Sequence, residues 1–109
     1  MIYELRTYWA APGKIEALHN RFRNVTLNVF KKHDMTVVGF WTPAIVTTET
    51  GDLVYIMAFG DEAAMQAAWD GFRADPDWIN GKAASEVNGS LVTKVTSVVL
   101  QATDYSPLK

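Results

Sequence analysis

The chain contains 109 residues, of which 49% are hydrophobic and 20% charged, and this length and composition are typical of one soluble globular domain with a single core. The formal net charge of -2 and the lack of any long run of Lys and Arg argue against a nucleic-acid-binding surface, and no apolar run is long enough to span a bilayer. Because the chain has no cysteine, disulfides, thiolate catalysis and cysteine-based metal centres are excluded. We expect one domain spanning residues 1–109, located in the cytoplasm.

The first third of the chain predicts a strand followed by a long helix. Residues 2–9 have strand character and end near Pro12-Gly13, a turn-forming pair. Over residues 14–34, apolar residues recur every three or four positions, which is the period of one helix face. The opposite face of this helix is predicted to be polar and to include Arg21. The apolar face consists of Ile15, Leu18, Phe22, Val25 and Val29.

The remainder of the chain predicts a hairpin, two helical pieces and a last strand. Residues 37–42 and 53–59 have the composition of two strands, joined by a long hairpin connection. Asp61 suits the N-cap of a helix, and Pro76 suits the first position of a second helical piece. The valine-rich residues 91–100 predict the last strand.

The resulting order of elements indicates a ferredoxin-like βαββαβ fold of the α+β class, with a four-stranded antiparallel sheet and the helices on one face. Along residues 53–59, both alternating sets of side chains are apolar. Because the helices leave the other sheet face bare, a monomer would expose a large apolar surface there. We therefore expect a homodimer with twofold symmetry, formed through that face.

The first predicted strand carries a charged pair in an otherwise apolar run. Glu4, Arg6 and Tyr8 share one face of this strand because strand side chains alternate. One interpretation is that Arg6 orients an anion beside a phenol that donates a proton, with Tyr55 of a later strand as a second candidate donor. The other is a structural ion pair at a barrel mouth or dimer contact, since structural networks use the same groups.

The two histidines both fall on the long predicted helix. His19 borders its apolar stripe, where a neutral imidazole would act as a general base, as a haem ligand or as a packed, hydrogen-bonded core residue. His33 falls in the last turn, where a protonated ring interacts favourably with the helix dipole. The two histidines lack the spacing of a zinc site, so we expect neither a metal ion nor a cofactor.

The chain is rich in aromatic residues for its length. Rings of this kind can wall a pocket for a flat apolar ligand, and Trp41, Trp69 and Phe22 are the candidates for such walls. Together with Tyr55 and Trp78, the same rings also suit a solid core or a subunit interface.

Several short motifs are spread over the whole chain: Tyr3-Glu4-Leu5-Arg6-Thr7-Tyr8, Pro12-Gly13-Lys14, Lys32-His33-Asp34-Met35, Val38-Gly39-Phe40-Trp41, Ala68-Trp69, Phe72-Arg73, Asp75-Pro76-Asp77-Trp78 and Thr103-Asp104-Tyr105-Ser106-Pro107. Together these motifs resemble those of the NIPSNAP family. The resemblance implies the dimeric α/β-barrel superfamily, in which two such sheets form a shared barrel with helices outside. Its members include cofactor-free monooxygenases, polyketide cyclases, lactone isomerases and haem-binding enzymes, so the resemblance implies no single activity.

These observations predict a protein that binds a small apolar or aromatic molecule between its helices and its sheet. Arg6 would supply the positive end of the pocket, Tyr8 or Tyr55 a hydroxyl donor, and His19 the base. The resemblance adds cofactor-free isomerase, cyclase or monooxygenase-like chemistry as options. The alternative is a non-catalytic structural or protein-interaction module, and haem binding is a minor alternative.

Overall fold

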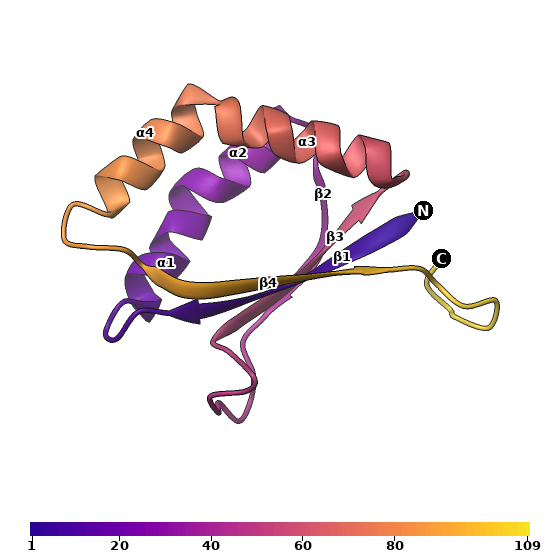
Figure 1. The fold of residues 1–109 in the computed structure, drawn as a ribbon, viewed down its shortest axis with the longest axis horizontal. Coiled ribbons are helices and arrows are strands. Elements are labelled where there is room, and N and C mark those ends of the chain that lie inside the picture. The colour runs from indigo at the N-terminus through magenta and orange to yellow at the C-terminus, as the bar shows by residue number, and fades with distance from the viewer.

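The computed structural model describes residues 1–109 as a four-stranded antiparallel sheet with helices on one face (Figure 1). The strand order is β2-β3-β1-β4, which confirms the ferredoxin-like arrangement predicted from the sequence. The strands are β1 (Ile2–Ala10), β2 (Thr36–Trp41), β3 (Leu53–Phe59) and β4 (Val92–Leu100).

Two helical rods cover one face of this sheet (Figure 1). Asp61 caps the second rod by accepting a hydrogen bond from the backbone N–H of Ala64 at 2.8 Å, as the sequence predicts. None of the helices has both the length and the apolar character needed to cross a membrane. The first rod runs through α1 (Ile15–Arg21), η1 (Phe22–Thr26) and α2 (Leu27–Lys32), and the second through α3 (Glu62–Ala74) and α4 (Pro76–Ser85).

Asp75 holds the bend between α3 and α4. Its carboxylate accepts a hydrogen bond from the backbone N–H of Asp77 at 2.8 Å, and it contacts Lys32 Nζ at 2.9 Å and His33 Nε2 at 2.7 Å. The hydrogen bonds from Lys32, the Asp77 backbone and His33 lower the pKa of Asp75 to about 2. The sequence predicts only a helix-dipole interaction for His33, whereas its ring also joins the end of the first rod to the second.

The middle of the first rod departs from α-helical geometry. Residues Phe22–Thr26 form a π-helical segment, which accommodates one more residue in its turn than an α-helix does. Arg21, which directly precedes this segment, and Thr26, its last residue, are both buried, with only 6% of Arg21 exposed. The prediction that Arg21 lies on the polar face is therefore wrong.

The core lies between the sheet and the two rods. In β3 the residues Leu53, Tyr55, Met57 and Phe59 are buried against the helices, while the intervening residues are half-buried on the other face. This is the alternation that the sequence predicts. The helix-facing side of the sheet is thus dry over β3 and becomes more accessible toward the edge strand β4, where Val95 and Val99 remain exposed.

The opposite face of the sheet has no helix over it (Figure 1). Trp41 and Val98 expose 51% and 50% of their surface, and Val98 lies across from Leu5 of β1 on this face. Residues of the C-terminal segment 101–109 border a groove on the same face beside Tyr3. The sheet therefore presents an apolar surface of the kind that the sequence predicts for this side.

Candidate functional site

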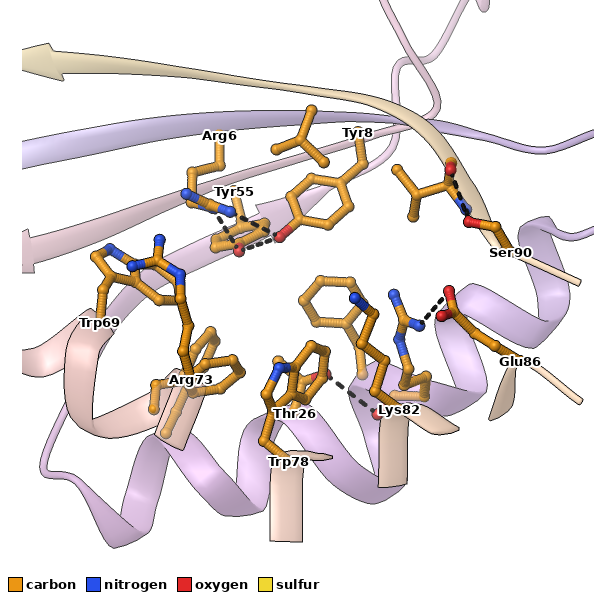
Figure 2. A pocket seen from close by; sticks show the side chains of 16 residues that line it. Arg6, Tyr8, Thr26, Tyr55, Trp69, Arg73, Trp78, Lys82, Glu86 and Ser90 are labelled. Carbon is orange, nitrogen blue, oxygen red and sulfur yellow. Dashed lines mark hydrogen bonds and ion pairs between the residues drawn. The ribbon is translucent and has the colours of Figure 1, made fainter. Parts of the chain in front are cut away.

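A cavity of about 310 Å³ opens between the sheet and the helices. Strands β1, β3 and β4 contribute one wall, and η1, α3 and α4 contribute the other (Figure 2). Val95 of the edge strand β4 lines the cavity and is exposed, so the cavity is open toward this edge. Its volume falls at the lower end of the range of roughly 300–1,000 Å³ that is usual for small-molecule sites.

Arg6 and two tyrosines form a hydrogen-bonded group on the sheet side of the cavity (Figure 2). Arg6 and Tyr8 share the helix-facing side of β1, and Tyr55 lies directly across from Arg6 on β3. Arg6 Nε donates to the Tyr55 hydroxyl at 2.9 Å, and Arg6 Nη2 donates to the Tyr8 hydroxyl at 3.1 Å. The two hydroxyl oxygens are themselves 2.9 Å apart. The structure therefore brings together three residues that the sequence analysis selects.

Glu4 holds this group in place through its ion pair with Arg6. Its carboxylate, only 4% exposed, accepts hydrogen bonds from Arg6 Nη1 at 3.0 Å, from Ser97 Oγ at 2.5 Å and from Trp69 Nε1 at 2.6 Å. The guanidinium of Arg6 also lies 4.4 Å from the centre of the Trp69 ring, within cation–π range. Arg6 is thus held in one position by its neighbours, which is the condition for a preorganised binding group.

Counting hydrogen atoms shows what this group can offer a ligand. A guanidinium has five N–H donors, and Arg6 uses three of them, on Glu4, Tyr8 and Tyr55, so two remain. Each hydroxyl already accepts from Arg6, and one hydroxyl hydrogen is used between the tyrosines. Tyr55 is fully buried whereas Tyr8 is half-buried, so donation from Tyr55 to Tyr8 leaves the Tyr8 hydrogen free for the cavity.

The protonation states of Arg6 and Tyr55 fit this role. Burial alone would lower the pKa of Arg6, but Tyr55, Tyr8 and Glu4 outweigh it and raise the pKa above its ordinary value. Burial, assisted by the adjacent Tyr8, holds the pKa of Tyr55 well above its usual range even though Arg6 opposes this. At neutral pH the group therefore contains a fixed positive charge and a neutral Tyr55 phenol.

Aromatic rings form most of the apolar wall. Phe22 of η1 packs edge-on against Tyr8 at 5.6 Å between ring centres, and Trp69 and Trp78 of the second rod line the same space. Of the three predicted wall residues, Phe22 and Trp69 thus lie at the cavity. Trp41 does not, because it lies across from Val54 on the other face of the sheet, where its ring covers Gly39.

The structure places His19 away from Arg6. His19 lines a separate cavity of about 190 Å³, with Phe40 and Leu53 among its other walls, and only Phe22 borders both cavities. The two histidines are absent from the lining of the larger cavity. The single carboxylate that lines the larger cavity is Glu86 of the segment after α4.

Glu86 is a weak base in this setting. Burial on its own would raise the pKa of Glu86, but the hydrogen bond from the Leu91 backbone N–H at 3.3 Å and the Arg21 guanidinium together lower it. The carboxylate is therefore ionised at neutral pH and has little tendency to accept a proton.

Comparison with known proteins identifies the family. The sequence profile of NIPSNAP proteins matches residues 3–107. The chain belongs to the NIPSNAP family. No match is found among curated proteins.

Solved NIPSNAP structures share this fold over its whole length. Protein Atu4242 of Agrobacterium tumefaciens is 24% identical, with all of both chains covered and a TM-score of 0.83. An uncharacterized NIPSNAP domain protein of Burkholderia xenovorans is 23% identical over 98% of this chain and 99% of its own, with a TM-score of 0.81. A more distant neighbour is a point mutant of MhuD with two manganese protoporphyrin IX bound per active site, at 15% identity, 94% coverage of each chain and a TM-score of 0.64.

Four charged lining residues of this NIPSNAP cavity escape prediction from the sequence. Arg21, Arg73, Lys82 and Glu86 all line it, and each is a charged residue on or next to a helix that reads as solvent-facing. Arg73 and Lys82 extend toward the cavity from α3 and α4 (Figure 2). No residue pattern signals the π-helical turn that directly follows Arg21. The three aromatic residues Trp69, Phe72 and Trp78, which lie close in the sequence to Arg73 and Lys82, are the one available hint.

Proposed function

We propose that this NIPSNAP protein binds a small planar aromatic molecule bearing a carboxylate or an enolate in the cavity between its helices and its sheet. The observation that carries this proposal is the group of unused donors, two N–H of Arg6 and one hydroxyl hydrogen of the tyrosine pair, beside walls of Phe22 and Trp69. An apolar pocket with a few fixed polar groups is the usual form of a small-molecule site. A guanidinium with a permanent charge favours an anionic end on the ligand.

The same donors would stabilise negative charge that develops on a bound oxygen. Cofactor-free isomerase, cyclase and monooxygenase-like reactions would all draw on such stabilisation of an enolate-like anion. His19 is distant from the donors and Glu86 is a weak base, so the proposal assigns anion binding to Arg6 and Tyr8 and assigns no proton-abstracting residue. We further propose a cytoplasmic location, which the cysteine-free composition fits.

Haem is a poor fit to this cavity. The neighbouring MhuD structure contains a manganese porphyrin, yet the cavity of this chain has no histidine in its lining. Its two tyrosine hydroxyls, the remaining candidates for an axial ligand, are hydrogen-bonded to each other and to Arg6. A non-catalytic interaction module is favoured by a different observation, the bare apolar sheet face, and that surface is better explained by self-association.

We propose that two copies of the chain cover each other's bare sheet face in a homodimer. Light scattering at micromolar concentration should give twice the mass of the chain. The interface in such a dimer should bury at least about 1,200 Å² in total. Val98→Glu on that face should shift the population toward monomer, because a charge would be buried beside Leu5. Lys31→Glu, on the exposed side of α2, serves as the control. A wild-type monomer at these concentrations would contradict the proposal.

A thermal-shift series tests ligand binding. Benzoate, indole-3-carboxylate and naphthalene-2-carboxylate should raise the melting temperature at millimolar concentration, whereas the corresponding amides should have little effect because they carry no charge for Arg6. Equal shifts from acids and amides would contradict a charge-selective site. Tyr8→Phe should reduce the shift by removing the hydroxyl that would donate to the ligand and that accepts from Arg6 and Tyr55, with Tyr105→Phe on the exposed C-terminal segment as the matched control.

A further inference from the structure

A second basic cluster lines the cavity away from Arg6. Arg21 of α1 and Lys82 of α4 reach the cavity near Glu86 and Ser90, which Figure 2 places at the end opposite Arg6 and Trp69. Arg21 lies 5.3 Å from the centre of the Trp78 ring. The cavity therefore has a positive side chain at each end and aromatic side chains along its length.

Arg21 is poorly satisfied for a buried cation. Only 6% of its surface is exposed. Its Nε is buried without any hydrogen-bond partner, and its Nη2 donates to no protein acceptor. Its Nη1 makes only two long contacts of 3.3 Å, to Ser85 Oγ and to Glu86 Oε2. Buried donors are almost always paired, so this guanidinium is short of an acceptor.

The charges around the cavity point in the same direction. Arg6, Arg21, Arg73 and Lys82 line it, against one lining carboxylate, Glu86. Even with Glu4 added behind Arg6, two positive charges are in excess. Glu86 is engaged by Arg21 and by the Leu91 backbone, and Lys82 makes no ion pair. The Arg21 end of the cavity thus retains cationic donors for an incoming anion.

We infer that the ligand carries two acidic groups, one bound by Arg6 and Tyr8 and the other by Arg21 and Lys82, joined by a flat apolar body. The inference rests on the proposed function and narrows its ligand class from aromatic monoacids to aromatic diacids. Phe22 and Trp78 flank the space between the two ends and would contact the body of the molecule. A neutral spacer of the length of one or two fused rings suits a cavity of about 310 Å³.

Calorimetric titration of the full-length protein with matched acids tests this inference. The probes are benzoate against isophthalate and terephthalate, and naphthalene-2-carboxylate against its 2,6-dicarboxylate. At least one diacid should bind about tenfold more tightly than its monoacid at low ionic strength, as expected for one added charge-assisted contact. Lys82→Met should remove most of this margin and weaken binding of the monoacid much less than binding of the diacid, because Arg6 and Tyr8 are not altered.

Two controls separate the possible failures. Lys31→Met removes an exposed lysine that does not line the cavity and should leave every affinity unchanged. If monoacids bind but no diacid binds more tightly, or if Lys82→Met weakens both classes equally, the second acidic subsite is refuted while the proposed function stands. If neither class of acid binds, the second acidic subsite and the proposed function are both refuted.

A second pair of variants tests Arg21 itself. Arg21→Lys retains the charge and should preserve part of the difference in affinity between diacid and monoacid that Arg21→Met removes. If Arg21→Met does not fold, Arg21→Lys takes its place in the comparison.

Discussion

Replacing Arg6 with Met is expected to abolish the thermal stabilisation that aromatic carboxylates confer on the protein. The side chain of Met fills a similar volume but has no charge and no N–H donor, so the polar end of the cavity would lose its cation. A hydrogen bond to a charged group contributes about 1.5–3 kcal/mol, and losing it would lower the affinity for the ligand roughly tenfold to a hundredfold. The stabilisation by a ligand grows with the logarithm of its concentration relative to Kd, so this loss of affinity lowers the melting-temperature shift at every ligand concentration. The measurement is the melting temperature of the two proteins across a ligand titration.

Two further variants keep this result interpretable. Arg6→Lys keeps a positive charge for Glu4 but loses the fork that reaches both tyrosines, so the protein should remain folded and bind the acid more weakly than wild type. Arg23→Met removes an exposed arginine that hydrogen-bonds to Asn20 and does not line the cavity beside Arg6, and ligand binding should be unaffected. If Arg6→Met dissociates or unfolds the protein and Arg6→Lys binds ligand as well as wild type does, Arg6 is a structural ion-pair partner and the site assignment fails.

Replacing Glu4 with Leu is expected to cost more stability than any other single change at the site. The substitution leaves Arg6 partly buried without its counterion, and it leaves the Trp69 indole N–H and the Ser97 hydroxyl without their acceptor. Removing one partner of a buried ion pair typically costs about 3–5 kcal/mol. Denaturant unfolding at pH 7 should therefore show a free energy of unfolding reduced by about that amount.

The unfolding measurement has two control variants, Glu4→Gln at the same position and Glu16→Leu at an exposed one. Glu4→Gln retains an acceptor for Trp69 and replaces the charged oxygen that accepts from Arg6 and Ser97 with an amide NH2, so its effect should be smaller than that of Glu4→Leu. Glu16→Leu changes an exposed acidic residue of α1 and should be nearly neutral. The double variant Glu4→Leu with Arg6→Met should recover part of the loss, because no buried charge then remains unpaired. A cost below about 1 kcal/mol for Glu4→Leu would contradict a buried, fully engaged carboxylate.

Local sequence patterns predict this fold well because apolar residues recur at every second position in the strands and at every third or fourth position in the helices. The alternation in β1 places Arg6 and Tyr8 together, and the alternation in β3 adds Tyr55 once the two strands pair in register. Trp69 follows from the stripe of a capped helix. These are short-range regularities, and pairing of neighbouring strands converts them into a shared site.

The part of the site contributed by the helices is less predictable. His19 borders the apolar stripe as expected, but the stripe faces two cavities, and the one beside His19 is not the one beside Arg6. Trp41 shows the converse problem, since a bulge between Val37 and Gly39 decides which sheet face it occupies. Arg21 lies directly before a local change of helix type. In each of these cases a non-local or irregular feature, rather than residue type, determines where the side chain points.

The π-helical turn at Phe22–Thr26 also has an evolutionary meaning. An α-helix advances by about 100° per residue, so loss of one codon within this turn would restore regular helix and rotate everything on one side of it relative to the other. Residues before the turn, such as Arg21, and residues after it, such as Val29, would then change their angular relation although no remaining codon had changed. The ligand preference of such a lineage could therefore diverge through a single insertion or deletion, a route that comparison of aligned residue identities alone would overlook.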